Sequence, residues 1–300
     1  MIWDCIVIGG GPAGLNAALV LGRSRRLTLL FDDNQPRNRV TNESHGFITR
    51  DGITPEAFRA IGYQELTAYP SINIQRQRVV SVTKQKDVFT VTADDASSYY
   101  AKTVILATGY KDVLPDIPAI HDYYGRSLFS CPFCDGWELR DQALVVIADN
   151  DRAFHFAQVV YNWSSDLIVC TNGHQVVTEQ EKVRLQEKSI SLYEQPIVAL
   201  SGSQGQLTSI TLADQTQITR NGGFIAANWE PATSFAKDLG CEFNQQGGIK
   251  TDDLGHTTVA GLLACGDVSI VNPSQLVIAA AEGSKAAIAV NAQLINKSFN

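Results

Sequence analysis

Cys131 and Cys134 are the residues of this chain whose spacing most clearly points to chemistry. Two cysteines separated by two residues can approach within one tight turn to the ~5.5–6 Å Cα separation of a disulfide. Pro132, which lies between them, limits the flexibility of that turn. Such an arrangement commonly lowers the pKa of one thiol and raises its thiolate fraction. The pair therefore indicates redox chemistry.

The alternative interpretation of this pair is half of a zinc site. Structural zinc needs four ligands, typically from a second Cys-X-X-Cys or Cys-X-X-His pair, and the neighbouring sequence offers none. The remaining cysteines, Cys5, Cys170, Cys241 and Cys265, lie singly in apolar stretches, where cysteine acts as a small hydrophobic residue. A single Cys-X-X-Cys pair in the chain favours a redox site in a reducing compartment over a scaffold held by disulfides. No metal is expected.

A glycine-rich loop near the N-terminus predicts dinucleotide binding. Gly9, Gly11 and Gly14 directly follow the apolar run 5–8, which is typical of a parallel strand buried on both faces. Glycines there permit a tight turn and bring a pyrophosphate close to the N-terminus of the next helix. Asp32 ends the following strand, about 20 residues further on, where a carboxylate would bind ribose hydroxyls.

The apolar pattern predicts a second unit of the same kind after the cysteine pair. Its strands are expected at 144–147 and 167–170, and the segments 72–106 and 189–220 have the alternation of antiparallel strands. An alanine-rich helix is expected from about Ser274. The fold class is therefore α/β, with two nucleotide-binding-type (Rossmann-like) domains, the second inserted into the first. The expected boundaries are 1–114 with 246–300 for the first domain and 115–245 for the inserted domain that carries the cysteine pair.

Composition excludes several functions. The 300 residues are 44% hydrophobic and 18% charged, which suits a soluble globular protein of about two domains. The net charge of −7 argues against a nucleic-acid partner, because phosphate contacts need clustered Lys and Arg. No stretch approaches the ~20 apolar residues of a transmembrane segment, and the first apolar run reads as a strand rather than a signal peptide. We expect a cytoplasmic protein, and peripheral membrane contact stays open.

Two later strand ends complete a resemblance. Ala107-Thr108-Gly109 and Gly266-Asp267 each end a buried apolar run. With the glycine loop and the cysteine pair, they make the chain resemble the low-molecular-weight thioredoxin reductase family of flavoproteins over essentially its whole length. The resemblance implies a bound FAD, although the family usually has arginine where this chain has Ser274. The residues that it places at FAD are Gly9, Gly11, Pro12, Ala13, Gly14, Asp32, Arg37, Asn38, His45, Ala107, Thr108, Gly109, Gly266, Asp267, Ser274 and Gln275.

The same resemblance implies roles at the cysteine pair. Cys131 and Cys134 would form a redox-active disulfide, in which Cys134 faces the flavin and Cys131 exchanges with a thiol partner, either a protein or a small molecule. Asp135 would act as a general acid or base, although an Asp before Gly136 is also a common turn pair. Because the family forms homodimers, we expect a homodimer here.

The inserted domain departs from the family at the loop that would bind NADPH. Ala148 and Asn150 hold the two essential glycine positions, so side chains replace the close approach to a pyrophosphate. Asp149 and Asp151 add negative charge, and each like-charge contact at ~4 Å would cost several kcal/mol in a surface-like dielectric. Arg152 offsets part of this repulsion.

Two further positions also lack features that the family uses to bind NADPH. The segment 171–175 lacks the basic residues that would pair a 2′-phosphate, and Ala227-Asn228 stands where the family often has Gly-His. NADPH is therefore not expected as the electron donor. A second FAD is left open, because a similar subgroup, the diflavin-linked disulfide oxidoreductases, pairs two flavins. Trp137 and Trp229 would then be either stacking partners of a flavin ring or simple core residues.

Three functional hypotheses remain at this point. The leading one is an FAD-dependent thiol–disulfide oxidoreductase of an NADPH-independent branch, with a second FAD as a potential relay for electrons taken from dithiols. The second is an NADPH-dependent thioredoxin reductase with an atypical site. The third is a non-catalytic flavin redox sensor, which the presence of Cys131, Cys134 and Asp135 disfavours.

Overall fold

Short apolar segments form the parallel sheet of the first of two units. The computed structural model describes residues 1–269 and 273–299, and within them this unit comprises Met1–Arg39, Gly46–Lys111 and Glu230–Asn300. Its strand order is β3-β2-β1-β6-β5-β4, with β17 also paired to β6. The parallel strands are β1 Ile2–Ile8, β2 Thr28–Phe31, β3 Ile72–Gln75, β6 Ser98–Leu106 and β17 Leu262–Ala264. The strands β4 Val79–Gln85 and β5 Val88–Ala93 are antiparallel.

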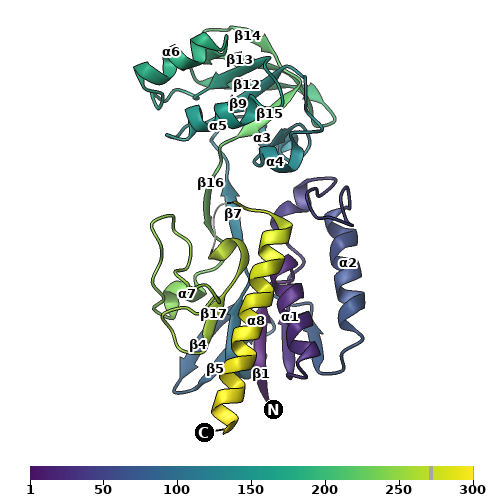
Figure 1. Ribbon diagram of the computed structural model, residues 1–300. Helices are drawn as coiled ribbons and strands as arrows, with labels where there is room; N and C mark the ends of the chain where they lie inside the picture. Colours follow the sequence, from purple (N-terminus) through teal and green to yellow (C-terminus); the bar gives the residue numbers. More distant parts are fainter. Residues whose placement is uncertain (270–272, 300) are drawn as a thin grey trace. The chain divides into compact units, whose positions relative to one another are not determined.

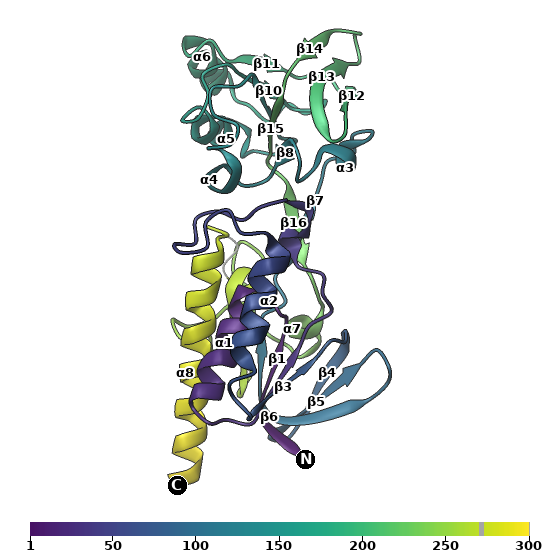
Figure 2. The same cartoon turned by 90° about the vertical axis from the view of Figure 1, so that its right-hand side faces the viewer.

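Alternate residues of β1 face opposite sides of this sheet, as the twofold period of a strand requires. Ile6 and Ile8 pack in one apolar cluster with Phe89 of β5. Cys5 and Val7 pack in a second cluster, together with residues of the helices that cover the other face. These helices are α1 Pro12–Arg23, α2 Pro55–Leu66 and α8 Leu276–Phe299, and Figures 1 and 2 show α1 and α8 side by side.

Gly283 explains how closely α8 approaches α1. A Cβ atom at Gly283 would overlap the carbonyl oxygen of Ala13, so only glycine permits this packing. The strand β3 was expected within an antiparallel segment, but it pairs parallel to β2. The physical reason is the intervening helix α2, because a helical crossover returns the chain in the direction of the preceding strand.

The second unit comprises Val40–His45 and Asp112–Trp229 and has its own parallel sheet, in the order β11-β10-β9-β15-β8. An antiparallel sheet of β12, β13 and β14 accompanies it. The strands are β8 Leu128–Phe129, β9 Leu144–Ile147, β10 Leu167–Cys170, β11 Ser191–Tyr193, β12 Ile197–Ser203, β13 Gln206–Leu212, β14 Gln217–Thr219 and β15 Gly222–Ile225. The helices are α3 Ile120–Tyr123, α4 Pro132–Asp135, α5 Ala153–Val160 and α6 Glu179–Glu187. The expected α/β fold class with two Rossmann-like sheets is confirmed.

The chain passes between the units through β7 Tyr110–Val113 and β16 Asn228–Pro231, which pair with each other. The sequence placed the return to the first unit at residue 246, whereas in the structure the first unit resumes at Glu230. The reason is packing: Phe235 and Ala236 of α7 Phe235–Asp238, together with Cys241, lie in the apolar cluster that contains Ile6. Among the helices of the described residues, none is both long and apolar enough to cross a bilayer.

Candidate active site

The cysteine pair forms a disulfide, as expected. Cys131 and Cys134 are bonded, with their Cα atoms 5.3 Å apart. Cys131 is extended at the N-terminus of α4, Pro132 occupies the first helical position, and the Cys134 amide donates to the Cys131 carbonyl at 3.0 Å. A Cβ at Gly136 would overlap the carbonyl oxygen of Pro132, so the turn requires glycine there. The sequence therefore determines this short loop almost residue by residue.

Asp135 has an acidity that suits proton exchange near neutral pH. Burial and the neighbouring carboxylate of Glu138 raise the pKa of Asp135 to about 7, against the opposing influence of His45. His45 Nε2 lies 3.7 Å from Glu138 Oε1 and 3.5 Å from Glu43 Oε2, and only 18% of its side chain is exposed. The resemblance placed His45 at the flavin, and the structure places it in the second unit beside these carboxylates.

Two aromatic side chains flank the disulfide on the surface. Phe133 and Trp137 are each 65% exposed. The Phe133 ring meets Trp163 edge-on at 5.4 Å, and the guanidinium of Arg140 lies 4.1 Å from the centre of the Trp137 ring. Trp137 is therefore not a core residue.

The carboxyl ends of β1, β6 and β17 form a cradle in the first unit. A Cβ at Gly9 would overlap the Ala107 carbonyl oxygen, and one at Gly14 would overlap the Gly9 carbonyl oxygen. A Cβ at Gly266 would lie 2.9 Å from the Ala13 Cβ. The loops predicted to bind FAD are thus brought together by contacts that exclude side chains at these three glycines.

The cradle fits a dinucleotide on two observations. Within the described part of the chain, no atom would lie within 4 Å of a Cβ at Gly11, and no side chain caps the N-terminus of α1, which Gly11 precedes. Free amide groups at such an end favour a pyrophosphate. Among the described residues, the buried Thr108 Oγ1 has no hydrogen-bond partner, and such an atom is one that a bound ligand satisfies.

Asp32 lies at the end of β2 as expected, but its carboxylate already has protein partners. Its Oδ2 accepts from Arg59 Nη2 and from the Tyr63 hydroxyl, and its Oδ1 accepts from the Asn34 amide at 3.0 Å. Burial and the Asp32 contact raise the pKa of Tyr63 to about 12, which keeps the hydroxyl protonated as a donor. Sequence reasoning missed Arg59 and Tyr63, although their spacing of four puts both on one face of α2.

Arg37 supplies a cation near the position where the family usually has arginine and this chain has Ser274. Arg37 Nη1 donates to Ser274 Oγ at 2.9 Å and lies 3.7 Å from Asp267 Oδ2. Ser274 Oγ in turn donates to Asp267 Oδ2 at 2.6 Å, and the Arg37 guanidinium lies 4.4 Å from the centre of the Tyr110 ring. Three more of the residues predicted at FAD are placed as follows. The half-buried Asn38 follows Arg37 in a 3-10 turn, and Gly109 has φ +65°. The Gln275 carbonyl accepts a hydrogen bond from the Ala279 amide at 3.0 Å.

The corresponding loop of the second unit is filled by its own side chains. Asn150 Nδ2 donates to the Ala226 carbonyl at 2.8 Å, and Asn150 Oδ1 accepts from the Arg152 amide at 3.2 Å. Arg152 Nη2 donates to the Ala227 carbonyl at 2.7 Å and to the Ala226 carbonyl at 3.0 Å. The Arg152 guanidinium also lies 4.6 Å from the centre of the Trp229 ring. Both side chains therefore bridge the loop to the end of β15.

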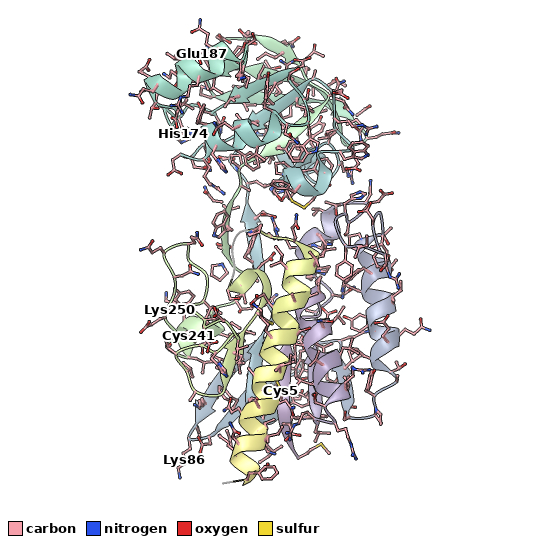
Figure 3. All side chains as sticks on the ribbon, in the orientation of Figure 1. Cys5, Lys86, His174, Glu187, Cys241 and Lys250 are labelled. Carbon is pink, nitrogen blue, oxygen red and sulfur yellow. A yellow bond between two sulfur atoms is a disulfide. The ribbon has the colours of Figure 1, made fainter. Side chains whose placement is uncertain are left out.

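The other four cysteines are free and buried, which confirms their expected structural role. Cys5 and Cys241, labelled in Figure 3, lie in the apolar clusters of the first unit. Burial raises the pKa of Cys5 and of Cys170 to about 12, so neither is a nucleophile near neutral pH. In the part of the chain that the structure describes, no three His, Cys, Asp or Glu side chains are arranged to hold a metal ion.

Comparison with known proteins gives consistent matches. The family model described as pyridine nucleotide-disulphide oxidoreductase matches residues 3–283. A solved structure, that of a putative thioredoxin reductase from Bacillus anthracis, is 45% identical with a TM-score of 0.96, and the match covers 99% of this chain and 100% of that one. Thioredoxin reductase sirT of Leptosphaeria maculans is 32% identical over 98% of this chain and 95% of its own length. A probable thioredoxin reductase of Arthroderma benhamiae is 38% identical over 177 residues, which are 57% of this chain and 44% of that relative.

Proposed function

The chain belongs to the pyridine nucleotide-disulphide oxidoreductase family, as a thioredoxin reductase-like enzyme that acts on a disulfide, and from this premise we propose that it moves electrons between Cys131–Cys134 and FAD without NADPH. The observation that carries the proposal is the bridge from Asn150 and Arg152 to the end of β15. Its substrate is a dithiol or a disulfide, of a protein or of a small molecule.

Family membership supports FAD as the cofactor. The open side of Gly11 and the N-terminus of α1 would hold its pyrophosphate, and Thr108 Oγ1 offers a hydrogen bond there. Asp32, held by Arg59 and Tyr63, would accept from the ribose with its remaining lone pairs. FAD supplies the two-electron acceptor that allows the cysteine pair to return to a disulfide.

The chemistry at the cysteine pair is thiol–disulfide exchange. A substrate thiolate attacks the Cys131 Sγ, the Cys131–Cys134 bond breaks, and Cys134 leaves as a thiolate. The second substrate thiolate then attacks the substrate sulfur of the mixed disulfide and releases the Cys131 thiolate. The substrate loses two electrons as its disulfide forms, and the cysteine pair gains them. Asp135 takes or returns the protons, because a pKa of about 7 keeps both of its forms accessible at neutral pH.

The second-unit loop argues against NADPH in two ways. A pyrophosphate in this loop would have to displace Arg152 from the Ala226 and Ala227 carbonyls, bonds that contribute about 0.5–1.5 kcal/mol each. The loop also carries Asp149 and Asp151, whose negative charges disfavour a pyrophosphate. Loss of the Arg152 contacts would also leave the buried Ala227 carbonyl without this donor, whereas the Ala226 carbonyl would keep its hydrogen bond from Asn150, so the added cost falls mainly on Ala227.

The second candidate is an NADPH-dependent thioredoxin reductase, and the names of the relatives from Bacillus anthracis and Leptosphaeria maculans favour it. Calorimetric titration of the FAD-loaded protein with NADPH separates the two candidates. We expect no saturable heat at concentrations up to the millimolar range. Saturable binding in the micromolar range, with reduction of the flavin, would establish the second candidate instead.

A second FAD as an electron relay is a further form of the proposal. The contacts of Asn150 and Arg152 obstruct an FAD pyrophosphate in this loop as much as that of NADPH, so a second flavin would bind elsewhere. Flavin released by denaturation, measured against protein concentration, tests this point: a ratio near two supports a relay, and a ratio near one removes it. The homodimer expected by resemblance is tested by sedimentation velocity.

A further inference from the structure

Four titratable side chains from two separate stretches of the second unit form one group that includes Asp135, the residue after Cys134. Asp135 ends α4 and Glu138 follows it by three residues. His45 and Glu43 come from the segment Val40–His45, some ninety residues earlier in the chain. The described structure therefore places an imidazole from a distant stretch of the chain among carboxylates whose charges act on Asp135.

The geometry fixes the position of His45 in this group. Its Nε2 lies between Glu138 Oε1 at 3.7 Å and Glu43 Oε2 at 3.5 Å, and its side chain is only 18% exposed. Glu43 and Glu138 are more open, at 57% and 41% exposure. Solvent therefore screens the carboxylates of Glu43 and Glu138. Asp135 is more buried, so its pKa responds more strongly to the charges around it.

We propose that His45 and Glu138 are positioning residues that set the protonation state of Asp135 during thiol–disulfide exchange. The inference deepens the proposed function and rests on it, because it assumes that Asp135 exchanges protons with the cysteine pair. Protonated His45 favours the Asp135 carboxylate, and ionised Glu138 opposes it. Glu43 contacts His45 rather than Asp135 in this group, at 3.5 Å from Nε2.

The two influences have opposite signs, which makes the proposal testable. Replacement of His45 by glutamine removes a potential cation, so the pKa of Asp135 should rise. Glu138→Gln removes an anion, so that pKa should fall. His45→Lys installs a permanent cation and should also lower it. Each shift should be on the order of half a pH unit, as expected for charges several ångströms apart in a partly solvated site.

The experiment measures the disulfide rather than the flavin. FAD-loaded protein is mixed with dithiothreitol between pH 5 and 9, quenched with acid at short times, and its new thiols are alkylated and counted by mass spectrometry. Asp135→Asn identifies the limb of the pH–rate profile that belongs to Asp135, because that limb disappears. His121→Gln, an exposed histidine on α3 of the same unit, is the matched control and should leave the profile unchanged.

The outcomes are distinct. An upward shift of the limb in H45Q together with a downward shift in E138Q and H45K supports the proposal. No shift, or shifts of the same sign in H45Q and E138Q, overturns it. If H45Q does not fold, E138Q and H45K still decide the question. Failure of the wild-type disulfide to react with dithiol at any pH would instead refute the proposed function itself.

Discussion

Arg152→Ala is expected to weaken the second unit substantially, because it removes the bridge between the degenerate loop and β15. The change deletes hydrogen bonds to the Ala226 and Ala227 carbonyls, at 3.0 and 2.7 Å, and a guanidinium contact with Trp229. Each bond contributes about 0.5–1.5 kcal/mol, and the ring contact about 0.5–1 kcal/mol. Ala226 and Ala227 are buried, at 3% and 6% exposure, so their carbonyls would lose a partner that water replaces poorly. We predict a loss of about 3 kcal/mol in the free energy of unfolding.

Urea unfolding followed by tryptophan fluorescence measures this loss. Trp137, Trp163 and Trp229 lie in the second unit and only Trp3 lies in the first, so the signal reports mainly on the second unit. Arg140→Ala is the matched control, since it also removes a guanidinium from a tryptophan ring, but at an exposed site with one backbone hydrogen bond. It should cost below about 1 kcal/mol. Equal effects of the two substitutions would refute the idea that Arg152 locks the loop.

Further predictions concern pH, the cradle and Asp32. Because the pKa of Asp135 is raised to about 7, the folded protein keeps a proton that the unfolded chain releases near pH 4. The free energy of unfolding should therefore fall as pH rises from about 4 to 7. Asp135→Asn should remove this part of the pH dependence in urea titrations. Gly11→Ala should weaken FAD retention on gel filtration without a change in the melting temperature of the FAD-free protein, because its Cβ would meet no atom of the described residues; unchanged retention would contradict the placement of the pyrophosphate. Gly283→Ala should lower the stability of the first unit by about 1–3 kcal/mol or more, since its Cβ overlaps the Ala13 carbonyl. Tyr63→Phe removes one donor to Asp32 and should weaken FAD binding by about 1 kcal/mol in fluorescence titrations; tighter binding would mean that Tyr63 competes with the ribose.

The predictable parts of this molecule are those set by local sequence. The glycine loop, the first strand and the turn of Cys131 to Gly136 follow from backbone sterics and short spacing, so sequence patterns identify them directly. The distant contacts do not have such a signal. Arg59 lies 27 residues from Asp32, and nothing in the period of α2 indicates that its guanidinium reaches a strand end.

The boundary near Glu230 and the position of His45 could not be predicted from sequence for the same reason. Residues 230–245 contain no long apolar run, and their return to the first unit depends on Phe235 and Cys241 entering a core formed by strands far away in sequence. His45 resembled a flavin-side residue by its motif, while the structure groups its segment with the second unit. Whether His45 also contacts the cofactor stays a prediction.

We propose that electrons reach FAD from the cysteine pair and not from NADPH. Parallel anaerobic titrations of the FAD-loaded protein with a dithiol and with NADPH test it most directly, followed by the flavin absorbance near 450 nm, with Cys134→Ser as the control that cannot form the disulfide. We expect bleaching by the dithiol in the wild-type protein, none in the variant, and none with NADPH in either. Rapid stoichiometric bleaching by NADPH would contradict it.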